Sequence, residues 1–200
     1  MKTKKYYAYI IPGTSEKGIM ENWQECEKIV SGKSEARYKG FPTREEARAW
    51  LDTGGDYGFK KQMEPGIYFD AGTGRGKGVE INVTDEQGES LLFKVMPKKR
   101  INRFGAHWIF GEATNNYGEL LACKYALQIA LKEDIKKIFG DSELVVNYWS
   151  KGFIKKKEVL AKTVGLARSA AKLRREFEEK GGEIIHISGD QNPADLGFHR

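Results

Sequence analysis

The chain has 200 residues, of which 40% are hydrophobic, 12% aromatic and 31% charged, a balance typical of a folded globular protein. This composition excludes a disordered or collagen-like chain, and no apolar run approaches the roughly 18 residues of a membrane helix. The 34 basic and 28 acidic residues give a net charge of +6, which suits a polyanionic partner but also an ordinary basic enzyme. Residues 1–5 lead into a tyrosine-rich segment without the apolar stretch of a signal peptide, so we expect a cytoplasmic protein.

The first 52 residues predict one small unit. Strands are expected at 6–11 and 36–41, and helices at 22–30 and 43–51. Thr43 is followed three residues later by Glu46, the pattern of a helix capping box. We expect Phe41 and Trp50 to form the core of this unit, and the glycine-rich residues 53–65 to form a linker.

The remaining residues predict a mixed sheet. Strands are expected at 66–70, 78–84, 89–95, 135–139 and 183–188, and helices at 117–132, 142–149 and 157–180. The first three strands are joined by short connections, which favours antiparallel pairing. A strand, helix, strand order then makes parallel neighbours, so the sheet is expected to carry helices on its faces. Cys26 and Cys123 lie far apart in sequence and are expected to be buried and unpaired.

Four carboxylates occupy positions that suit a site at the edge of this sheet. Asp70 lies at or just past the end of one strand and Asp141 just past the end of another, and a right-handed crossover through the helix between those strands is expected to bring the two carboxylates together at the carboxyl edge. Glu119 lies in the first turn of that helix. Asp195 follows the last strand and is expected to approach from the other side. Any one of these acids taken alone is equally typical of a surface or capping residue.

Clustered carboxylates repel one another, so a protein that gathers them needs a compensating cation. Hard oxygen ligands select Mg²⁺ or Mn²⁺. Two such ions about 4 Å apart activate water and stabilise the leaving oxygen in phosphodiester cleavage. The four acids therefore favour metal-dependent chemistry on a phosphodiester.

Four short segments around these acids occur in order along the chain: residues 68–72, 114–120, 140–147 and 192–196. Together they resemble the type 1 ribonuclease H family, whose members cleave the RNA strand of RNA/DNA hybrids with two Mg²⁺ ions. The most specific part is Thr114-Asn115-Asn116 ahead of the helical Glu119. The resemblance implies an α/β fold in residues 66–200, a ribonuclease H-like mixed five-stranded sheet with helices on both faces.

The same resemblance assigns the site residues. It implies that Asp70, Glu119, Asp141 and Asp195 are the catalytic residues and hold two Mg²⁺ ions, with Mn²⁺ as a substitute. It also implies that Asn115 and Asn116 meet the substrate strands, that Thr114 contacts a phosphate, and that the backbone at Gly72 and Thr73 lies against the RNA minor groove.

The chain departs from the family pattern at three places. Many members have a histidine in the loop before the last aspartate, whereas here Asp190 lies nearest that position. We expect His186 to be a packed or hydrogen-bonded strand residue. The short loop resembles the branch of the family that lacks both this histidine and the basic protruding handle. Glu112 stands where some members carry an arginine for phosphate.

The N-terminal unit carries a second resemblance. Tyr6 to Tyr9, Trp23 to Cys26 and Ala36 to Phe41 resemble the small α+β hybrid-binding domain that precedes many cellular type 1 ribonucleases H. The resemblance implies that Trp23 and Tyr38 pack on the DNA backbone and that Lys39 meets a phosphate. A second lysine of that family is replaced by Gly40. The alternative is that these aromatic residues only form a small core.

We therefore expect a hybrid-binding domain at 1–52, a linker at 53–65 and a ribonuclease H catalytic domain at 66–200. The protein is expected to be a monomer that acts on RNA/DNA hybrids and does not bind membranes. The basic runs at 94–103 and 155–180 are typical of solvated faces, although Lys98 to Arg100 also suits an extension of the duplex-binding surface. Two alternatives remain: a polynucleotidyl transferase of the same fold, and a hybrid-binding protein without catalysis.

Overall fold

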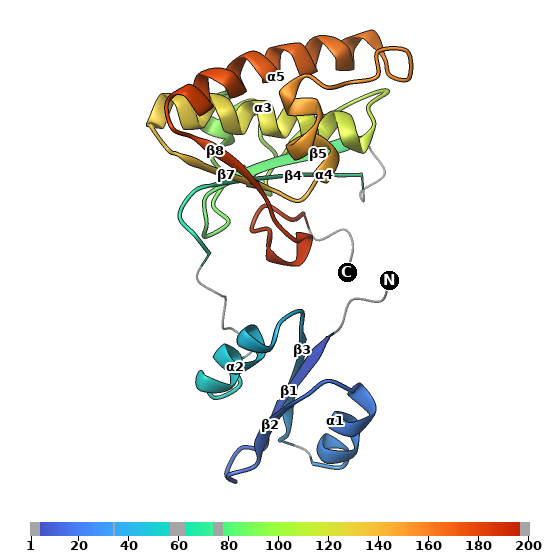
Figure 1. The fold of residues 1–200 in the computed structure, drawn as a ribbon, viewed down its shortest axis with the longest axis vertical. Helices are drawn as coiled ribbons and strands as arrows, with labels where there is room; N and C mark the ends of the chain where they lie inside the picture. The colour runs from blue at the N-terminus through green and yellow to red at the C-terminus, as the bar shows by residue number, and fades with distance from the viewer. Residues whose placement is uncertain (1–4, 34, 57–62, 74–77, 197–200) are drawn as a thin grey trace. The chain divides into compact units, whose positions relative to one another are not determined.

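The computed structural model describes residues 5–33, 35–56, 63–73 and 78–196, and the chain divides into two compact units, Met1–Gln62 and Met63–Arg200 (Figure 1). The predicted linker at 53–65 spans this division, and its residues 57–62 lie outside the described residues. In the part of the chain that is described, no helix combines the length and the apolar character needed to cross a membrane.

The N-terminal unit is a three-stranded antiparallel sheet with two helices. Its elements in chain order are β1 (Tyr6–Ile10), β2 (Lys17–Met20), α1 (Trp23–Val30), β3 (Arg37–Phe41) and α2 (Arg44–Asp52), and the strand order is β2-β1-β3. The side chains of Asn22 and Thr43 cap the two helices by accepting bonds from backbone amides. Strand β2 was not predicted from the sequence, because a glycine in a four-residue strand weakens its pattern.

The two faces of this small sheet differ. Ala8, Phe41 and Trp50 are buried together on the face that packs against α2, which confirms the expected core. Because side chains alternate along a strand, Tyr7 and Tyr9 of β1 lie on the opposite face. That second face carries the aromatic residues discussed below.

The C-terminal unit is built on a mixed five-stranded sheet, as predicted. Its strands are β4 (Ile67–Gly72), β5 (Val79–Thr84), β6 (His107–Ile109), β7 (Lys137–Gly140) and β8 (Glu183–His186), in the order β6-β5-β4-β7-β8. The pairs β4–β5 and β5–β6 are antiparallel, and the pairs β4–β7 and β7–β8 are parallel. The α-helices are α3 (Asn115–Glu133), α4 (Glu143–Asn147) and α5 (Ala161–Glu179).

The two long helices cover one face of the sheet. Side chains of α3 and α5 form the main core with alternate residues of β4 and β5, and both cysteines of the chain are buried and free. On the other face, residues 189–196 cover the sheet, with the 3-10 helix η4 (Gly189–Gln191) among them (Figure 1). Ala194 packs there against the stacked rings of Tyr68 and Phe139. Within the described residues, this face is covered by a loop with a 3-10 turn.

The third strand lies elsewhere than predicted. The sequence favoured a strand at 89–95, but only Ser90 bridges to Thr84, and the chain then turns into the 3-10 helix η1 (Leu92–Lys94). Leu92 and Met96 are both buried in the core, so their burial comes from a helical turn and not from strand pairing. After η2 (Lys98–Arg100), the edge strand β6 completes the antiparallel part of the sheet.

Candidate active site

Three carboxylates meet at the carboxyl edge of the parallel pair β4 and β7. Asp70 lies in β4, and Asp141 directly follows β7, whose Gly140 is paired with Phe69. Glu119 comes from the first turns of α3. One carboxylate oxygen from each of these three residues lies within 4.8 Å of the others. The structure therefore brings together three of the four acids expected to form the site.

Glu119 reaches this edge because α3 packs unusually close to the sheet. Thr114 caps the helix, with its hydroxyl accepting a bond from the Tyr117 amide at 3.2 Å. A Cβ on Gly118 would lie only 2.4 Å from a methyl carbon of Val79 and 2.9 Å from the Cβ of Ala71, so no larger residue fits there. The Ala71 amide then donates to Glu119 Oε1 at 3.1 Å.

Asp195 lies on the segment that covers the other side of the cluster. The Leu196 amide donates to Asp70 Oδ2 at 3.2 Å, which ties this segment to the site. The charge of Asp195 contributes to raising the pKa of both Asp70 and Asp141, so it lies close enough to act on them. Its own carboxylate is outside the group of three whose oxygens lie within 4.8 Å.

Two asparagines that the sequence analysis did not single out hold this covering segment. Asn192 is buried, donates to the Phe69 carbonyl at 2.9 Å and accepts from the Ala194 amide. Burial raises the pKa of Asp141, and Asn192 partly opposes that rise. Asn82 of β5 is buried too and donates to the Ala194 carbonyl at 3.2 Å. Asn192 precedes a proline and opens the 192–196 segment of the family resemblance, but neither signal predicted its hydrogen bonds.

Burial and mutual repulsion raise the pKa values of the acids in the cluster. Burial first, and then the charge of Asp141, raise the pKa of Asp70 to about 7. Burial and the charges of Asp70 and Asp141 raise the pKa of Glu119 to about 9. Burial also raises the pKa of Asp141. Each shift has the sign expected for carboxylates gathered without a counter-charge.

The cluster fits a divalent cation. Glu119 Oε2 is a buried oxygen with no hydrogen-bond partner among the described residues, although its neighbouring oxygen is bonded. The other candidate metal ligands in the cluster are also carboxylate oxygens, the hard ligands that Mg²⁺ and Mn²⁺ prefer. A cation here would neutralise the repulsion and complete the coordination of the unbonded Glu119 oxygen.

The residues expected to touch substrate border this cluster. Thr114 and Asn116 are exposed and Asn115 is half-buried at the start of α3, while Gly72 and Thr73 lie at the end of β4. The glycine-rich turn continues into residues 74–77, which lie outside the described residues. The exposed Asp190 belongs to η4, and His186 lies 3.0 Å from the Asp141 carbonyl through Nε2, which confirms it as a hydrogen-bonded strand residue.

The structure adds a cation that the sequence analysis did not identify. Lys162, at the start of α5, donates through Nζ to the backbone carbonyl of Glu112, and Nζ lies 5.2 Å from the centroid of the Tyr117 ring. The ammonium group therefore lies beside the loop that contains Glu112. The two positions are 50 residues apart in sequence, so only the fold reveals their proximity.

The N-terminal unit presents two of its three expected binding residues on one face. The Trp23 ring lies 5.3 Å from that of Tyr38 and 5.5 Å from that of Tyr7, measured between centroids. Tyr38 is 44% exposed. Lys39 points to the other face of β3, where its Nζ lies 5.7 Å from the centroid of Phe41.

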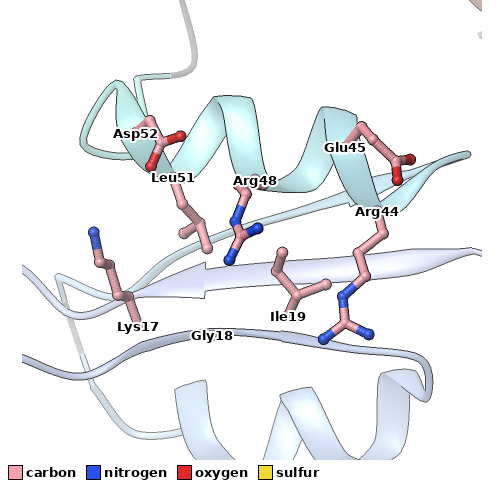
Figure 2. A pocket seen from close by; sticks show the side chains of 8 residues that line it. All are labelled: Lys17, Gly18, Ile19, Arg44, Glu45, Arg48, Leu51 and Asp52. Carbon is pink, nitrogen blue, oxygen red and sulfur yellow. The ribbon is translucent and has the colours of Figure 1, made fainter.

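A cavity of about 420 Å³ lies between α2 and β2 (Figure 2). Its charged lining residues are Lys17, Arg44, Arg48, Glu45 and Asp52, over an apolar floor that includes Ile19 and Leu51. None of the residues predicted to bind substrate lines this cavity. It belongs to the α2 face, opposite the face that carries Tyr7 and Tyr38.

Two comparisons with known proteins find similarity to this chain. Residues 5–51 match the family model of the ribonuclease H1 N-terminal domain, the family that the sequence of this unit resembles. Among solved structures, the chain is similar to RNase H1 from the halophilic archaeon Halobacterium salinarum NRC-1. The identity is 22%, the match covers 65% of this chain and 89% of that one, and the TM-score is 0.40.

Proposed function

We propose that this protein is an endoribonuclease that cleaves the RNA strand of RNA/DNA hybrids with divalent cations, and that its N-terminal unit holds the hybrid. The observation that carries the proposal is the cluster of Asp70, Glu119 and Asp141 beside the exposed start of α3. An acidic site by itself suits several phosphodiester reactions. The match of the other unit to a ribonuclease H1 domain favours the hybrid as substrate.

The three clustered acids, with Asp195, would hold the cations, for which Mg²⁺ is the proposed ion and Mn²⁺ a substitute. When bound, the cations supply an activated water and charge stabilisation at the leaving oxygen. The Ala71 amide orients Glu119 before substrate arrives. Asn115 and Asn116 would contact the substrate strands, and Lys162, which donates to the Glu112 carbonyl, would neutralise a backbone phosphate nearby.

The decisive experiment compares labelled RNA/DNA hybrid, duplex RNA and duplex DNA, each with and without Mg²⁺. The expected result is Mg²⁺-dependent cleavage of the RNA strand of the hybrid alone. Asp70→Asn is expected to remove nearly all cleavage while hybrid binding persists, because it removes a ligand charge from the site.

Asp134→Asn is the matched control. Asp134 is an exposed acid at the other end of α3 in a left-handed conformation, with φ of 57°, which asparagine also adopts readily. It is expected to leave cleavage unchanged. Wild-type protein that binds the hybrid but never cleaves it would favour the alternative, a binding protein without catalysis. Near wild-type cleavage by Asp70→Asn would show that the site is wrongly assigned.

A further inference from the structure

Arg174 of α5 is the one buried cation among the described residues, and the site described above does not account for it. It is 5% exposed, whereas the other charged residues buried there are the acids Asp70, Glu80 and Glu119. Its Nε pairs with the carboxylate of Glu178, one turn later on α5, at 2.7 Å. Burying a guanidinium is costly unless its N–H groups are bonded, so its other partners indicate what the charge holds in place.

Those partners lie on the segment that follows Asp141. Arg174 Nη1 donates to the carbonyl of Val146 at 2.5 Å and to Ser150 Oγ at 2.6 Å. The Ser150 hydroxyl in turn donates to the carbonyl of Val145 at 2.7 Å. Both carbonyls belong to the end of α4, where a helix leaves its last carbonyls without helical partners. Arg174 therefore holds the end of α4 directly and through Ser150.

The first turn of α4 carries this restraint back toward the site. The amides of Val145 and Val146 donate to the carbonyl of Ser142 at 3.0 and 2.9 Å. Ser142 directly follows Asp141 in the chain. The two residues whose carbonyls are held by the Arg174 network are thus the two whose amides hold the neighbour of Asp141.

Arg174 also lies close to α3, the helix that runs alongside α5 and carries Glu119 (Figure 1). Cys123 is buried one turn after Glu119, and burial raises the pKa of its thiol to about 12. The charge of Arg174 opposes that rise and the charge of Glu119 adds to it, so the thiol is near enough for both charges to act on it. The guanidinium is therefore at the junction of α3, α4 and α5.

The effect of Arg174 on the site is one of position. The pKa shifts of Glu119 and Asp141 are caused by burial, hydrogen bonds and the charges of nearer residues, without a contribution from Arg174. We propose, resting on the function proposed above, that Arg174 is a positioning residue: by holding the end of α4 against α3 and α5, it sets the spacing of the Asp141 and Glu119 carboxylates and so the affinity for divalent cations.

The first test measures Mg²⁺ binding without catalysis. Thermal unfolding of the wild-type chain and of Arg174→Met is followed over a range of Mg²⁺ concentrations, and each protein is compared with its own unfolding temperature in a chelator. A general loss of stability is present in both measurements, so the difference reports the affinity for the cation. Arg174→Met is expected to need about ten-fold more Mg²⁺ than wild type for the same rise in unfolding temperature.

Hybrid cleavage gives the second readout. Arg174→Met is expected to need about ten-fold more Mg²⁺ for half-maximal cleavage. Its KM for the hybrid at saturating Mg²⁺ should equal that of wild type, because the buried side chain does not touch substrate. Arg174→Lys keeps a cation but lacks the planar fork that joins α4 to Glu178, so its Mg²⁺ requirement should lie between the two. This variant replaces Arg174→Met in both tests if the methionine variant does not fold.

Arg175→Met is the matched control. Arg175 is the next residue on α5, is exposed, and donates to the carbonyl of Ala171 within its own helix. Its Mg²⁺ requirement is expected to equal that of wild type. If the Arg174 variants unfold at a lower temperature but need no more Mg²⁺ than wild type, Arg174 only stabilises the fold and the proposal is overturned. A wild-type chain whose unfolding temperature does not respond to Mg²⁺ would instead contradict the cation site of the proposed function, on which this inference rests.

Discussion

The backbone amide of Ala71 donates a hydrogen bond of 3.1 Å to Glu119, and so joins the first turns of α3 to the strand residue that follows Asp70. This bond engages one oxygen of the carboxylate and leaves the other buried without a partner among the described residues. The orientation of Glu119 is consequently set by the main chain before any ligand arrives. Its unbonded oxygen is the feature of the site that most directly calls for a cation.

The first prediction concerns the stability of the metal-free protein. The pKa of Asp70 is raised to about 7 and that of Glu119 to about 9, above their unfolded values near 4, so the folded state binds protons more tightly. The free energy of unfolding is therefore expected to fall between about pH 4 and about pH 9. Thermal unfolding in a chelator measures this slope, and Mg²⁺ should raise the unfolding temperature most at the alkaline end.

Glu119→Gln is the control for that experiment, because it removes a titrating group and keeps the shape of the side chain. Its unfolding temperature should depend less on pH and respond less to Mg²⁺ than that of the wild-type chain. If the unfolding temperatures of both proteins depend on pH in the same way, the carboxylate cluster is not the source of that dependence.

The second prediction concerns Asp190, the residue that the sequence resemblance puts nearest the family's loop histidine. Because Asp190 is exposed on η4, we expect Asp190→Asn to change turnover only slightly. The pH–rate profile should also lack an inflection near the histidine value of about 6.5. A large loss of turnover in the variant would identify Asp190 as a working acid or base.

The third prediction tests Lys162 as the cation that compensates for Glu112. Lys162→Ala is expected to raise KM and to reduce the salt dependence of hybrid binding by about one phosphate contact. Lys172→Ala provides the comparison, since it removes an equal charge from an exposed position ten residues later on α5. Equal effects of the two variants would indicate general charge attraction and no contact specific to Lys162.

The fourth prediction tests the aromatic face of the N-terminal unit. Trp23→Ala in the full chain is expected to weaken hybrid binding by roughly 1 to 3 kcal/mol, the range for a stacking contact, with normal cleavage at saturating substrate. Thermal unfolding must accompany the assay, because Trp23 also contacts Tyr7 and Tyr38 within a small unit. An early melt, or unchanged affinity, would favour a core role for Trp23.

Lys39 is tested separately, since it projects from the other face of β3. The family resemblance predicts that Lys39→Ala lowers the salt dependence of binding by about one phosphate contact. If only the face of Trp23 and Tyr38 meets the hybrid, the variant will bind as tightly as wild type at every salt concentration.

The parts of the fold that follow from local pattern and connection rules were predictable. Asp70 and Asp141 meet because Asp70 lies near the carboxyl end of β4, Asp141 follows β7 and these two strands are parallel neighbours, a pairing that the sequence pattern already predicted. The edge strand β6 and the packing of Leu92 depend on contacts between distant segments. The local apolar pattern at 89–95 therefore predicted a strand that the structure does not form. For the same reason, Asn192 and Lys162 gained a role only when the fold placed them beside Phe69 and Glu112.

Lys39 illustrates a different limit. The alternation of side chains along a strand is visible in the sequence and separates Tyr38 from Lys39. Their adjacency in the chain and the family resemblance nevertheless grouped them on one surface. The register of β3 against β1 shows that neighbours in sequence serve opposite faces of the sheet.

The tight packing at Gly118 has a consequence for how this site can vary. Because the helix touches Val79 and Ala71 there, even one added methyl group would displace the first turns of α3 as a block. That block contains Glu119 together with Thr114, Asn115 and Asn116. The spacing between the group that would bind a cation and the groups that would grip the nucleic acid is thus fixed by a single rigid turn, and neither set can be repositioned without moving the other.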